Sequence, residues 1–204
     1  MVEQAVSSQQ SPAGSKSGPK SAGTKSKDTR GAPGARGKRP RKQSEYGRQL
    51  TEKQKVKETY GMRERQFRRF FGIARRSKEA TGEQLLSLLE RRIDNVVYRL
   101  KFASTRKQAR QLVAHGHILI NGKRVYTPSI IVSVDDVITL SPQTLKHESF
   151  LKDVVDKRLN TNVRVPDWLE LDKAARSGRI LRLPVRADVP LPVEENLIVE
   201  LYSK

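Results

Sequence analysis

The hydrophobic positions of this 204-residue chain begin abruptly. Before Leu50 the sequence contains no Leu, Ile, Phe or Trp, and it consists mainly of Ser, Gly, Pro, Lys, Arg and other small or polar residues. Such a segment cannot bury enough apolar surface to offset the conformational entropy that ordering would cost. We therefore predict that residues 1–44 are disordered in the free protein.

Two helices are predicted where regular hydrophobic spacing begins. Residues 49–59 and 62–78 are rich in Lys, Arg, Glu and Gln, which favour helices, and Gly61 lies between them. One face of the second helix is apolar and consists of Phe67, Phe70, Phe71 and Ala74. This helical spacing predicts a buried stripe.

A further helical pattern runs from residue 81 to residue 100. Its apolar positions recur at helical spacing and are Leu85, Leu89, Ile93, Val96, Val97 and Leu100. Thr81 and Gln84 have the spacing of a capping box, whose side chains bond free backbone N–H groups of the first turn. Asp94 is interpreted as an exposed charge of this helix.

A second cap, Thr105 with Gln108, predicts another helix that ends at His115, and the following Gly116 suits the left-handed conformation that stops a helix. Asn121-Gly122 then separates two β-prone runs, 117–120 and 123–125. Both residues of this pair tolerate positive φ angles, so the pattern predicts a tight β-hairpin.

Strands are also predicted at residues 130–134 and 137–140. In the C-terminal part we predict an amphipathic helix over residues 149–159, a loop around a half-buried Trp168, and a strand over residues 197–201. Helices followed by antiparallel strands indicate an α+β fold.

The charge of the chain points to its partner. Lys and Arg number 41 against 22 Asp and Glu, which gives a formal net charge of +19 at pH 7, and most of the surplus lies in the first 80 residues. Since like charges repel, we expect a polyanion to bind, with nucleic acid as the first candidate.

Several classes of protein are excluded by composition. The chain has no Cys, which rules out disulfides, Cys zinc sites and thiol nucleophiles. No segment is apolar enough to span a membrane, and the N-terminus lacks the hydrophobic stretch of a signal peptide. We expect a soluble, intracellular protein.

The predicted helix at residues 62–78 and its flanks carry six arginines outside the apolar stripe: Arg63, Arg65, Arg68, Arg69, Arg75 and Arg76. A planar guanidinium can donate paired hydrogen bonds to phosphate and can stack on bases. We expect RNA contact at this helix, and the alternative is an ordinary solvated helix face.

Seven basic residues of the following module are expected to converge on one side of it: Arg91, Arg92, Arg106, Lys107, Arg110, Lys123 and Arg124. His115 and Asn121 complete the candidate RNA contacts. We expect binding through many phosphate contacts, with RNA shape rather than base edges giving specificity.

Two other motifs are rejected. Residues 116–123 resemble a phosphate-binding loop, but the second Gly falls one position late and Arg124 stands where a Ser or Thr would hold magnesium. His115 and His117 lack a third metal ligand nearby in the sequence. No cofactor, metal or small-molecule substrate is expected.

The sequence RKQARQLVAHGHILINGK at residues 106–123 resembles the helix-hairpin RNA-binding module of small-subunit ribosomal protein four, some tRNA synthetases and some pseudouridine synthases. Further motifs resemble the ribosomal protein family in particular: SEYG at 44–47 with EKQKVK at 52–57, ERQFR at 64–68, and LIVELYSK at 197–204. The resemblance runs from about residue 34 to the end.

This resemblance implies a structural, non-enzymatic protein of the cytoplasmic 30S ribosomal subunit. It implies direct, early binding to 16S rRNA, which helps the 5′ domain of that RNA to fold. It also implies a place beside small-subunit proteins three and five near the channel through which mRNA enters. With protein five, the family influences decoding accuracy, and no homo-oligomer is implied.

The resemblance also implies a division of the chain. A mostly helical first domain spans residues 45–90 and is completed by residues 150–204 through a C-terminal strand. The helix-helix-hairpin RNA-binding module at residues 91–149 is inserted between them. Residues 1–44 form a disordered basic tail, in place of the folded segment, sometimes with a four-Cys zinc site, that begins many family members.

Two smaller groups of residues receive roles by the same resemblance. A basic arm near the mRNA channel consists of Arg36, Lys38, Arg39, Arg41 and Lys42. Expected contacts with neighbouring proteins are Tyr46, Glu195, Glu200 and Tyr202.

Two rival hypotheses stay open. An RNA-modifying enzyme could carry the same module, but the C-terminal segment is short for a catalytic domain. A free RNA chaperone or stalled-ribosome factor could keep every basic residue named above.

Overall fold

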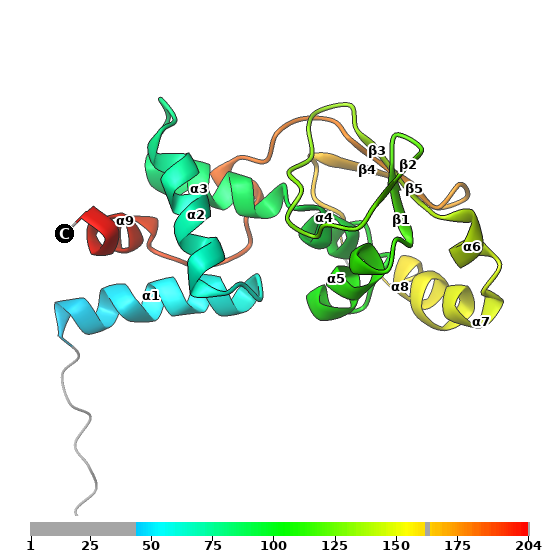
Figure 1. The fold of residues 1–204 in the computed structure, drawn as a ribbon, viewed down its shortest axis with the longest axis horizontal. Coiled ribbons are helices and arrows are strands. Elements are labelled where there is room, and N and C mark those ends of the chain that lie inside the picture. Colours follow the sequence, from blue (N-terminus) through cyan, green and yellow to red (C-terminus); the bar gives the residue numbers. More distant parts are fainter. Residues whose placement is uncertain (1–43, 162–163, 204) are drawn as a thin grey trace, which may run out of the picture. The chain divides into compact units, whose positions relative to one another are not determined.

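The computed structural model describes residues 44–161 and 164–203. The described part contains two hydrophobic cores, one in a helical lobe and one in a module with a β-sheet (Figure 1). The basic-arm residues Arg36, Lys38, Arg39, Arg41 and Lys42 lie outside the described residues, as does most of the tail predicted to be disordered.

The helical lobe consists of α1 (Glu45–Thr59), α2 (Glu64–Arg75), α3 (Thr81–Glu90) and α9 (Glu195–Ser203). Although α9 is the last element of the chain, it packs against α1 and α3 (Figure 1). The apolar stripe of α2 is buried as predicted and comprises Phe67, Phe70, Phe71 and Ala74. The first two predicted helices are thus confirmed, with slightly different ends.

The strand predicted over residues 197–201 is wrong, because these residues belong to α9. The β-branched residues of this segment favour a strand locally, but such preferences yield to packing. Ile198 is fully buried in the helical lobe, and Tyr202, one helical turn later, stacks on Phe71 with ring centroids 4.6 Å apart. A helix places both side chains on the same face.

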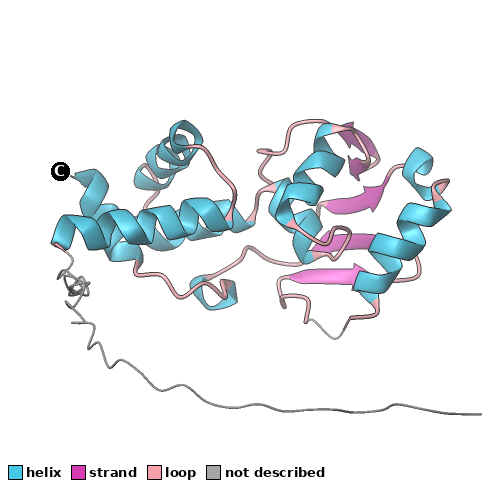
Figure 2. Ribbon diagram, turned by 90° about the horizontal axis from the view of Figure 1, so that it is seen from below, coloured by secondary structure: helices cyan, strands magenta, loops and turns pink. Residues whose placement is uncertain are grey.

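The module is built on a five-stranded antiparallel sheet with the order β2-β1-β3-β5-β4. Its strands are β1 (Ile118–Ile120), β2 (Lys123–Val125), β3 (Val137–Leu140), β4 (Leu169–Asp172) and β5 (Ser177–Ile180). Its helices are α4 (Ile93–Arg99), α5 (Arg106–Ala114), α6 (Pro142–Leu145), α7 (Glu148–Phe150) and α8 (Lys157–Leu159), with a π-helical segment, Leu151–Asp156, between the last two. The helices lie on one face of the sheet (Figures 1 and 2).

Three local predictions in the module are confirmed. Asn121 and Gly122 adopt φ angles of 50° and 78° in the turn between β1 and β2. The Thr105 hydroxyl accepts a hydrogen bond from the Gln108 backbone N–H at 3.2 Å and caps α5. Gly116 ends that helix with a φ of 72°. Each feature depends on residues close in sequence, which is why the pattern could reveal it.

The long helical pattern at residues 81–100 is broken in two. The backbone leaves the helix after Glu90 because residues 91–93 bond a distant segment instead. The Ile93 N–H donates to the Ile130 carbonyl at 2.9 Å, and the Val132 N–H donates to the Arg91 carbonyl at 3.0 Å. The predicted strand at 130–134 is therefore wrong and is reduced to an isolated bridge.

The capping box predicted at Thr81 is also wrong. Ala80 occupies the N-cap position of α3 and has no side chain that could cap the helix. The Gln84 amide instead donates hydrogen bonds to Ser77 and Glu79, in the turn that precedes the helix. A loop with polar side chains of its own competes for the capping group.

Residues 150–180 differ from the predicted division of domains. Four apolar side chains of this segment lie in the core of the module: Leu151, Val155, Leu159 and Trp168. Strands β4 and β5 extend the sheet of the module. The chain returns to the helical lobe only near the short 3-10 turn Arg186–Asp188. Trp168, predicted to be half-buried, is fully buried.

The contact between β5 and α4 yields a stability prediction. A Cβ atom at Gly178 would lie 2.4 Å and 2.5 Å from the two methyl carbons of the fully buried Leu100. Gly178→Ala should therefore lower the free energy of unfolding by about 1–3 kcal/mol through overpacking. Urea unfolding measures this change.

Gly72 provides the matched control, because a Cβ atom there would have no neighbour within 4 Å. Gly72→Ala lies inside α2 and should raise the free energy of unfolding by about 0.5–1 kcal/mol through helix propensity. Changes of the same sign in both variants would contradict the packing argument.

Candidate nucleic-acid interface

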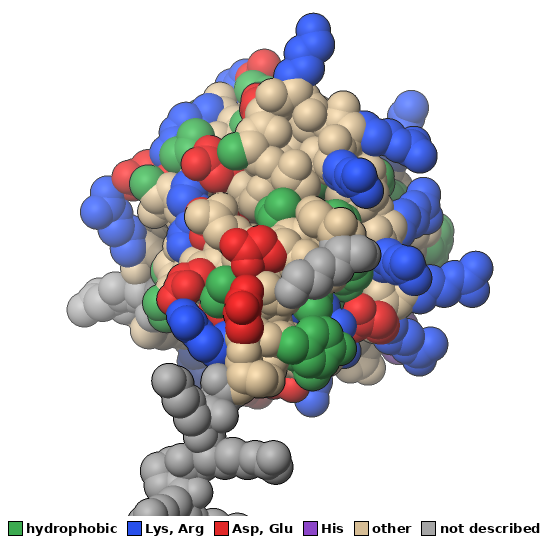
Figure 3. Space-filling model, turned by 90° about the vertical axis from the view of Figure 1, so that its left-hand side faces the viewer, with side chains coloured by type: hydrophobic (Ala, Val, Ile, Leu, Met, Phe, Trp, Pro, Cys, Tyr) green, Lys and Arg blue, Asp and Glu red, His purple; other side chains and the backbone are tan. Residues whose placement is uncertain are grey.

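Six arginines at α2 form an exposed basic surface, which we call the α2 arginine surface: Arg63, Arg65, Arg68, Arg69, Arg75 and Arg76. Within the described residues, none of these six side chains forms a hydrogen bond or an ion pair. The opposite side of α2 is buried in the helical lobe, so the guanidinium groups can only point outward. In a view of this end of the molecule, Lys and Arg side chains project on several sides and most densely along the right-hand border (Figure 3).

Glu64 fixes the start of α2 within the helical lobe. Its carboxylate accepts hydrogen bonds from Lys53 at 2.9 Å, from the Tyr202 hydroxyl at 2.7 Å and from Lys57 at 3.3 Å. Partial burial alone would raise the pKa of Glu64, but these hydrogen bonds outweigh it and lower the pKa to about 2. Burial and the bond to Glu64 raise the pKa of Tyr202.

Three of the four residues predicted to contact other proteins have partners inside the lobe. Tyr202 binds Glu64, Glu200 accepts a hydrogen bond from Gln49, and Glu195 accepts one from Arg186. The fourth, Tyr46, is 59% exposed. Among these residues, Tyr46 is the one that presents a large exposed apolar surface.

Several predicted RNA contacts of the module are exposed: Lys107, His115, Asn121, Lys123 and Arg124. Asn121 has a structural task as well, because its amide donates to Asp136 at 2.8 Å and accepts from the Val137 N–H at 2.9 Å. These bonds hold the hairpin turn against β3. Lys123 and Arg124 follow that turn directly, so the turn sets their position.

Arg92 is removed from the candidate RNA contacts because it is buried, with 1% of its surface exposed. Its guanidinium donates two hydrogen bonds to Asp94, at 3.1 Å and 2.7 Å, and lies 5.2 Å from the centre of the Phe70 ring. The interpretation of Asp94 as an exposed charge is likewise wrong. A buried arginine requires a carboxylate, and Asp94 supplies it.

Three other arginines of the predicted cluster, Arg91, Arg106 and Arg110, are half-buried and also have partners. Arg91 donates to the Val132 carbonyl at 2.9 Å. Arg106 donates to the Asn95 side chain at 2.9 Å, and Arg110 donates to Asp94 at 2.8 Å and 3.1 Å. The structure therefore brings Arg92 and Arg110 together on the carboxylate of Asp94. These two arginines bind a partner inside the protein, whereas the arginines of the α2 arginine surface face solvent.

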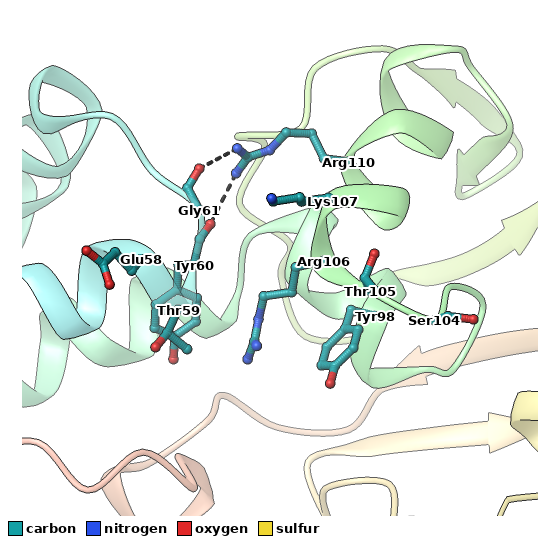
Figure 4. A pocket seen from close by; sticks show the side chains of 10 residues that line it. All are labelled: Glu58, Thr59, Tyr60, Gly61, Tyr98, Ser104, Thr105, Arg106, Lys107 and Arg110. Carbon is teal, nitrogen blue, oxygen red and sulfur yellow. Dashed lines mark hydrogen bonds between the residues drawn. The ribbon is translucent and has the colours of Figure 1, made fainter. Parts of the chain in front are cut away.

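A basic pocket of about 550 Å³ lies between the end of α1 and the start of α5 (Figure 4). The Arg106 guanidinium passes between the rings of Tyr60 and Tyr98, 5.3 Å and 4.7 Å from their centres. Lys107 and Arg110 also line the pocket. Cations beside aromatic faces suit both the phosphates and the bases of RNA.

Sequence reasoning missed Tyr98 as part of this pocket. Its position in α4 matches an ordinary helical pattern, and Tyr60 comes from a different part of the chain. No sequence signal links the two rings, because only the fold places them on either side of Arg106.

Within residues 44–161 and 164–203, no group of three His, Cys, Asp or Glu side chains could hold a metal ion. No helix in this described part has the length and hydropathy to cross a membrane.

An antiparallel sheet with helices on one face, joined to a helical lobe that exposes unpartnered arginines, defines an α+β RNA-binding protein. Comparison with known families agrees. Residues 9–90 match the ribosomal protein S4/S9 N-terminal domain, and residues 91–138 match the S4 domain. The match thus begins well before residue 34, where the sequence resemblance was placed.

Known relatives are similar over most of their length. The small ribosomal subunit protein uS4 of Thermoanaerobacter sp. (strain X514) is 52% identical over 85% of this chain and 82% of its own. The uS4 proteins of Pelobacter propionicus and Chloroflexus aurantiacus are 54% and 51% identical, over 84% and 88% of this chain and 81% and 86% of their own. The chain belongs to the uS4 family of small ribosomal subunit proteins.

Family membership settles the general role of the molecule. It is a structural, non-enzymatic constituent of the small ribosomal subunit, with an RNA-binding S4 domain and ribosomal RNA as a partner. The hypothesis of an RNA-modifying enzyme is thereby excluded.

The anchoring of α2 by Glu64 predicts a pH dependence of stability. Because the pKa of Glu64 in the folded protein, about 2, lies below its ordinary value of 4.5, the ionised form stabilises the fold. That contribution is complete above about pH 4.5 and is lost as the pH falls toward 2. Glu64→Gln should therefore lose less stability than the wild type between these pH values, as measured by thermal unfolding.

Glu83→Gln is a suitable control for the change of charge, because Glu83 is exposed on α3 of the same lobe. If the Glu64→Gln and wild-type curves stay parallel down to pH 2, the proposed stabilisation by the ionised carboxylate is refuted.

Proposed function

We propose that this protein binds 16S rRNA directly and early, and that its binding nucleates folding of the 5′ domain during 30S assembly. It further lies near the channel through which mRNA enters and contributes to translational accuracy together with small-subunit protein five. These finer roles go beyond family membership, and each has its own support.

The α2 arginine surface carries the proposal of direct rRNA binding. Six exposed guanidinium groups without partners in the described residues leave a strong local surplus of positive charge. Such groups bind phosphate in pairs of hydrogen bonds and release counterions when they do so. A rigid helix presents them at fixed spacing, which suits recognition of a folded RNA junction by shape.

The module supplies the second contact region. Lys107, Lys123 and Arg124 are exposed, and the basic pocket lies between the module and the helical lobe. An RNA that contacts both regions would be held at two separated places. This arrangement favours an RNA whose helices already meet at the matching angle, and a primary binder that stabilises a junction acts in this way.

The roles near mRNA and beside neighbouring proteins have separate support. The sequence of the basic arm, with five cations within residues 36–42, suits contact with a phosphate backbone. Exposed apolar side chains suit contact with proteins five and three. Exposed side chains of this kind in the helical lobe and on the segment that leads back to it include Tyr46, Leu181, Leu183 and Val185.

The test is equilibrium binding of the full chain to a transcript of the 16S rRNA 5′ domain, beside an unrelated structured RNA of equal length, across a series of salt concentrations. We expect tighter binding to the 5′ domain that persists at moderate salt. Equal binding to both RNAs, lost together as salt rises, would reject the proposal in favour of a generic basic RNA-binding protein.

Two variants test the α2 arginine surface itself. Arg68→Gln and Arg69→Gln should each weaken binding to the 5′ domain and reduce the slope of log affinity against log salt by roughly one unit, since each removes a phosphate contact. Lys152→Gln is the control, because it removes an exposed charge that already pairs with Glu148. Unchanged slopes for both arginine variants would exclude this surface as the binding site.

A further inference from the structure

We propose that Arg110 is a positioning residue that fixes the helical lobe relative to the module, so that their two basic surfaces bind one RNA as a single site. This inference rests on the proposed function. It separates Arg110 from the arginines that contact RNA, although the sequence alone places it among them.

The hydrogen bonds of Arg110 span the junction of the two lobes (Figure 4). From α5 in the module, the guanidinium donates to the carbonyl of Gly61 at 2.5 Å and to that of Tyr60 at 3.2 Å. It also donates to Asp94 at 2.8 Å and 3.1 Å. A guanidinium has five N–H donors, and the Arg110 guanidinium uses four of them in these hydrogen bonds. One N–H group is therefore left to bind a phosphate.

The acceptors in the helical lobe suit a cation. Tyr60 is the C-cap of α1 and Gly61 follows it, so their carbonyls lie at the negative end of a helix of 15 residues. Carbonyls at this end lack partners within the helix. The Arg110 guanidinium satisfies two of them with a fixed, forked geometry that the single ammonium of a lysine cannot reproduce.

On the module side, Asp94 holds Arg110 in place. Asp94 is buried at the first turn of α4 and is itself bound by two hydrogen bonds from the buried Arg92. Arg92 lies over the Phe70 ring of α2. A continuous series of contacts therefore runs from α2 through Arg92, Asp94 and Arg110 to the end of α1.

This series adds a non-covalent connection to the two that the chain itself makes between the lobes. The chain itself joins them at residues 91 and 92, between α3 and α4, and again where residues 181–185 lead back to the helical lobe. Such short backbone links allow rotation, whereas bonds from α5 to the end of α1 restrict it. Two RNA-contacting surfaces together raise the affinity of the protein for one RNA only while the distance and angle between them match that RNA.

The decisive experiment measures lobe orientation in the free protein. The chain has no Cys, so single cysteines introduced at the exposed positions Glu83 in α3 and Gln143 in α6 can carry a pair of spin labels. Pulsed electron resonance should give a broader distance distribution for Arg110→Gln than for the wild type. Thermal unfolding of the labelled protein verifies that the variant is folded.

Binding to the 16S rRNA 5′-domain transcript is measured on the same proteins. Arg110→Gln should weaken binding by about tenfold through lost preorganisation, while the slope against log salt stays that of the wild type. Lys107→Gln is the matched comparison, because it removes one positive charge from an exposed position on the same helix. It should leave the distance distribution unchanged.

Three results would overturn the inference. The first is an unchanged distance distribution in Arg110→Gln, and the second is a slope reduced by about one unit, which would make Arg110 a phosphate contact. The third is a broader distribution with unaltered affinity, because orientation would then not matter to binding.

Arg110→Lys keeps the positive charge but loses the two-nitrogen geometry with which the guanidinium binds both carbonyls. This variant replaces Arg110→Gln in the experiment if Arg110→Gln does not fold. It should likewise broaden the distances, and wild-type distances in it would count against the inference. Because the distances are measured without RNA, they test the contact of Arg110 even if the wild type shows no preference for the 5′ domain.

Discussion

The buried carboxylate of Glu90 forms the centre of the junction between the two lobes, and the contacts of Arg110 restrict the lobes from beside it. The Glu90 carboxylate accepts hydrogen bonds from Tyr60 at 2.7 Å, from Asn95 at 2.7 Å and from Arg99 at 2.6 Å and 3.0 Å, and it is fully buried. Burial alone would lower the pKa of Arg99, but the hydrogen bond and charge of Glu90 raise it. Removing one partner of such a pair typically costs about 3–5 kcal/mol. The ends of α1 and α3 and the face of α4 are therefore held at one point.

The arginines around this point differ in their partners from the arginines of α2. Arg92, Arg99 and Arg110 lie against the carboxylates of Asp94 and Glu90 and hold the fold together. The exposed arginines of α2 have no such partner in the described residues. Each such ion pair cancels one positive and one negative charge and leaves the net charge of +19 unchanged, so within the described residues the charge available to RNA lies on exposed groups such as the α2 arginine surface.

The sequence revealed features that depend on near neighbours and missed those that depend on distant ones. The hairpin turn at Asn121, the cap at Thr105 and the glycine stop at Gly116 each need only a few adjacent residues, and all three were predicted. The break after Glu90 requires a segment some forty residues away, and the C-terminal helix requires the stacking partners in α2. For the same reason Arg92 and Arg68 look alike in the sequence: the burial of Arg92 depends on a fold that no local pattern records.

A polar junction between two separate apolar cores has a consequence for RNA binding. Apolar contacts are non-directional and tolerate sliding, whereas hydrogen bonds to Glu90, Asp94 and the end of α1 require particular angles. Salt screens exposed charges much more than buried ones. Rising salt should therefore weaken RNA binding at the exposed arginines while the junction between the lobes stays intact. The slope of log affinity against log salt then reports the number of phosphate contacts, and it contains no contribution from a loosened junction. The molecule keeps its binding geometry under the very conditions that weaken its hold on RNA.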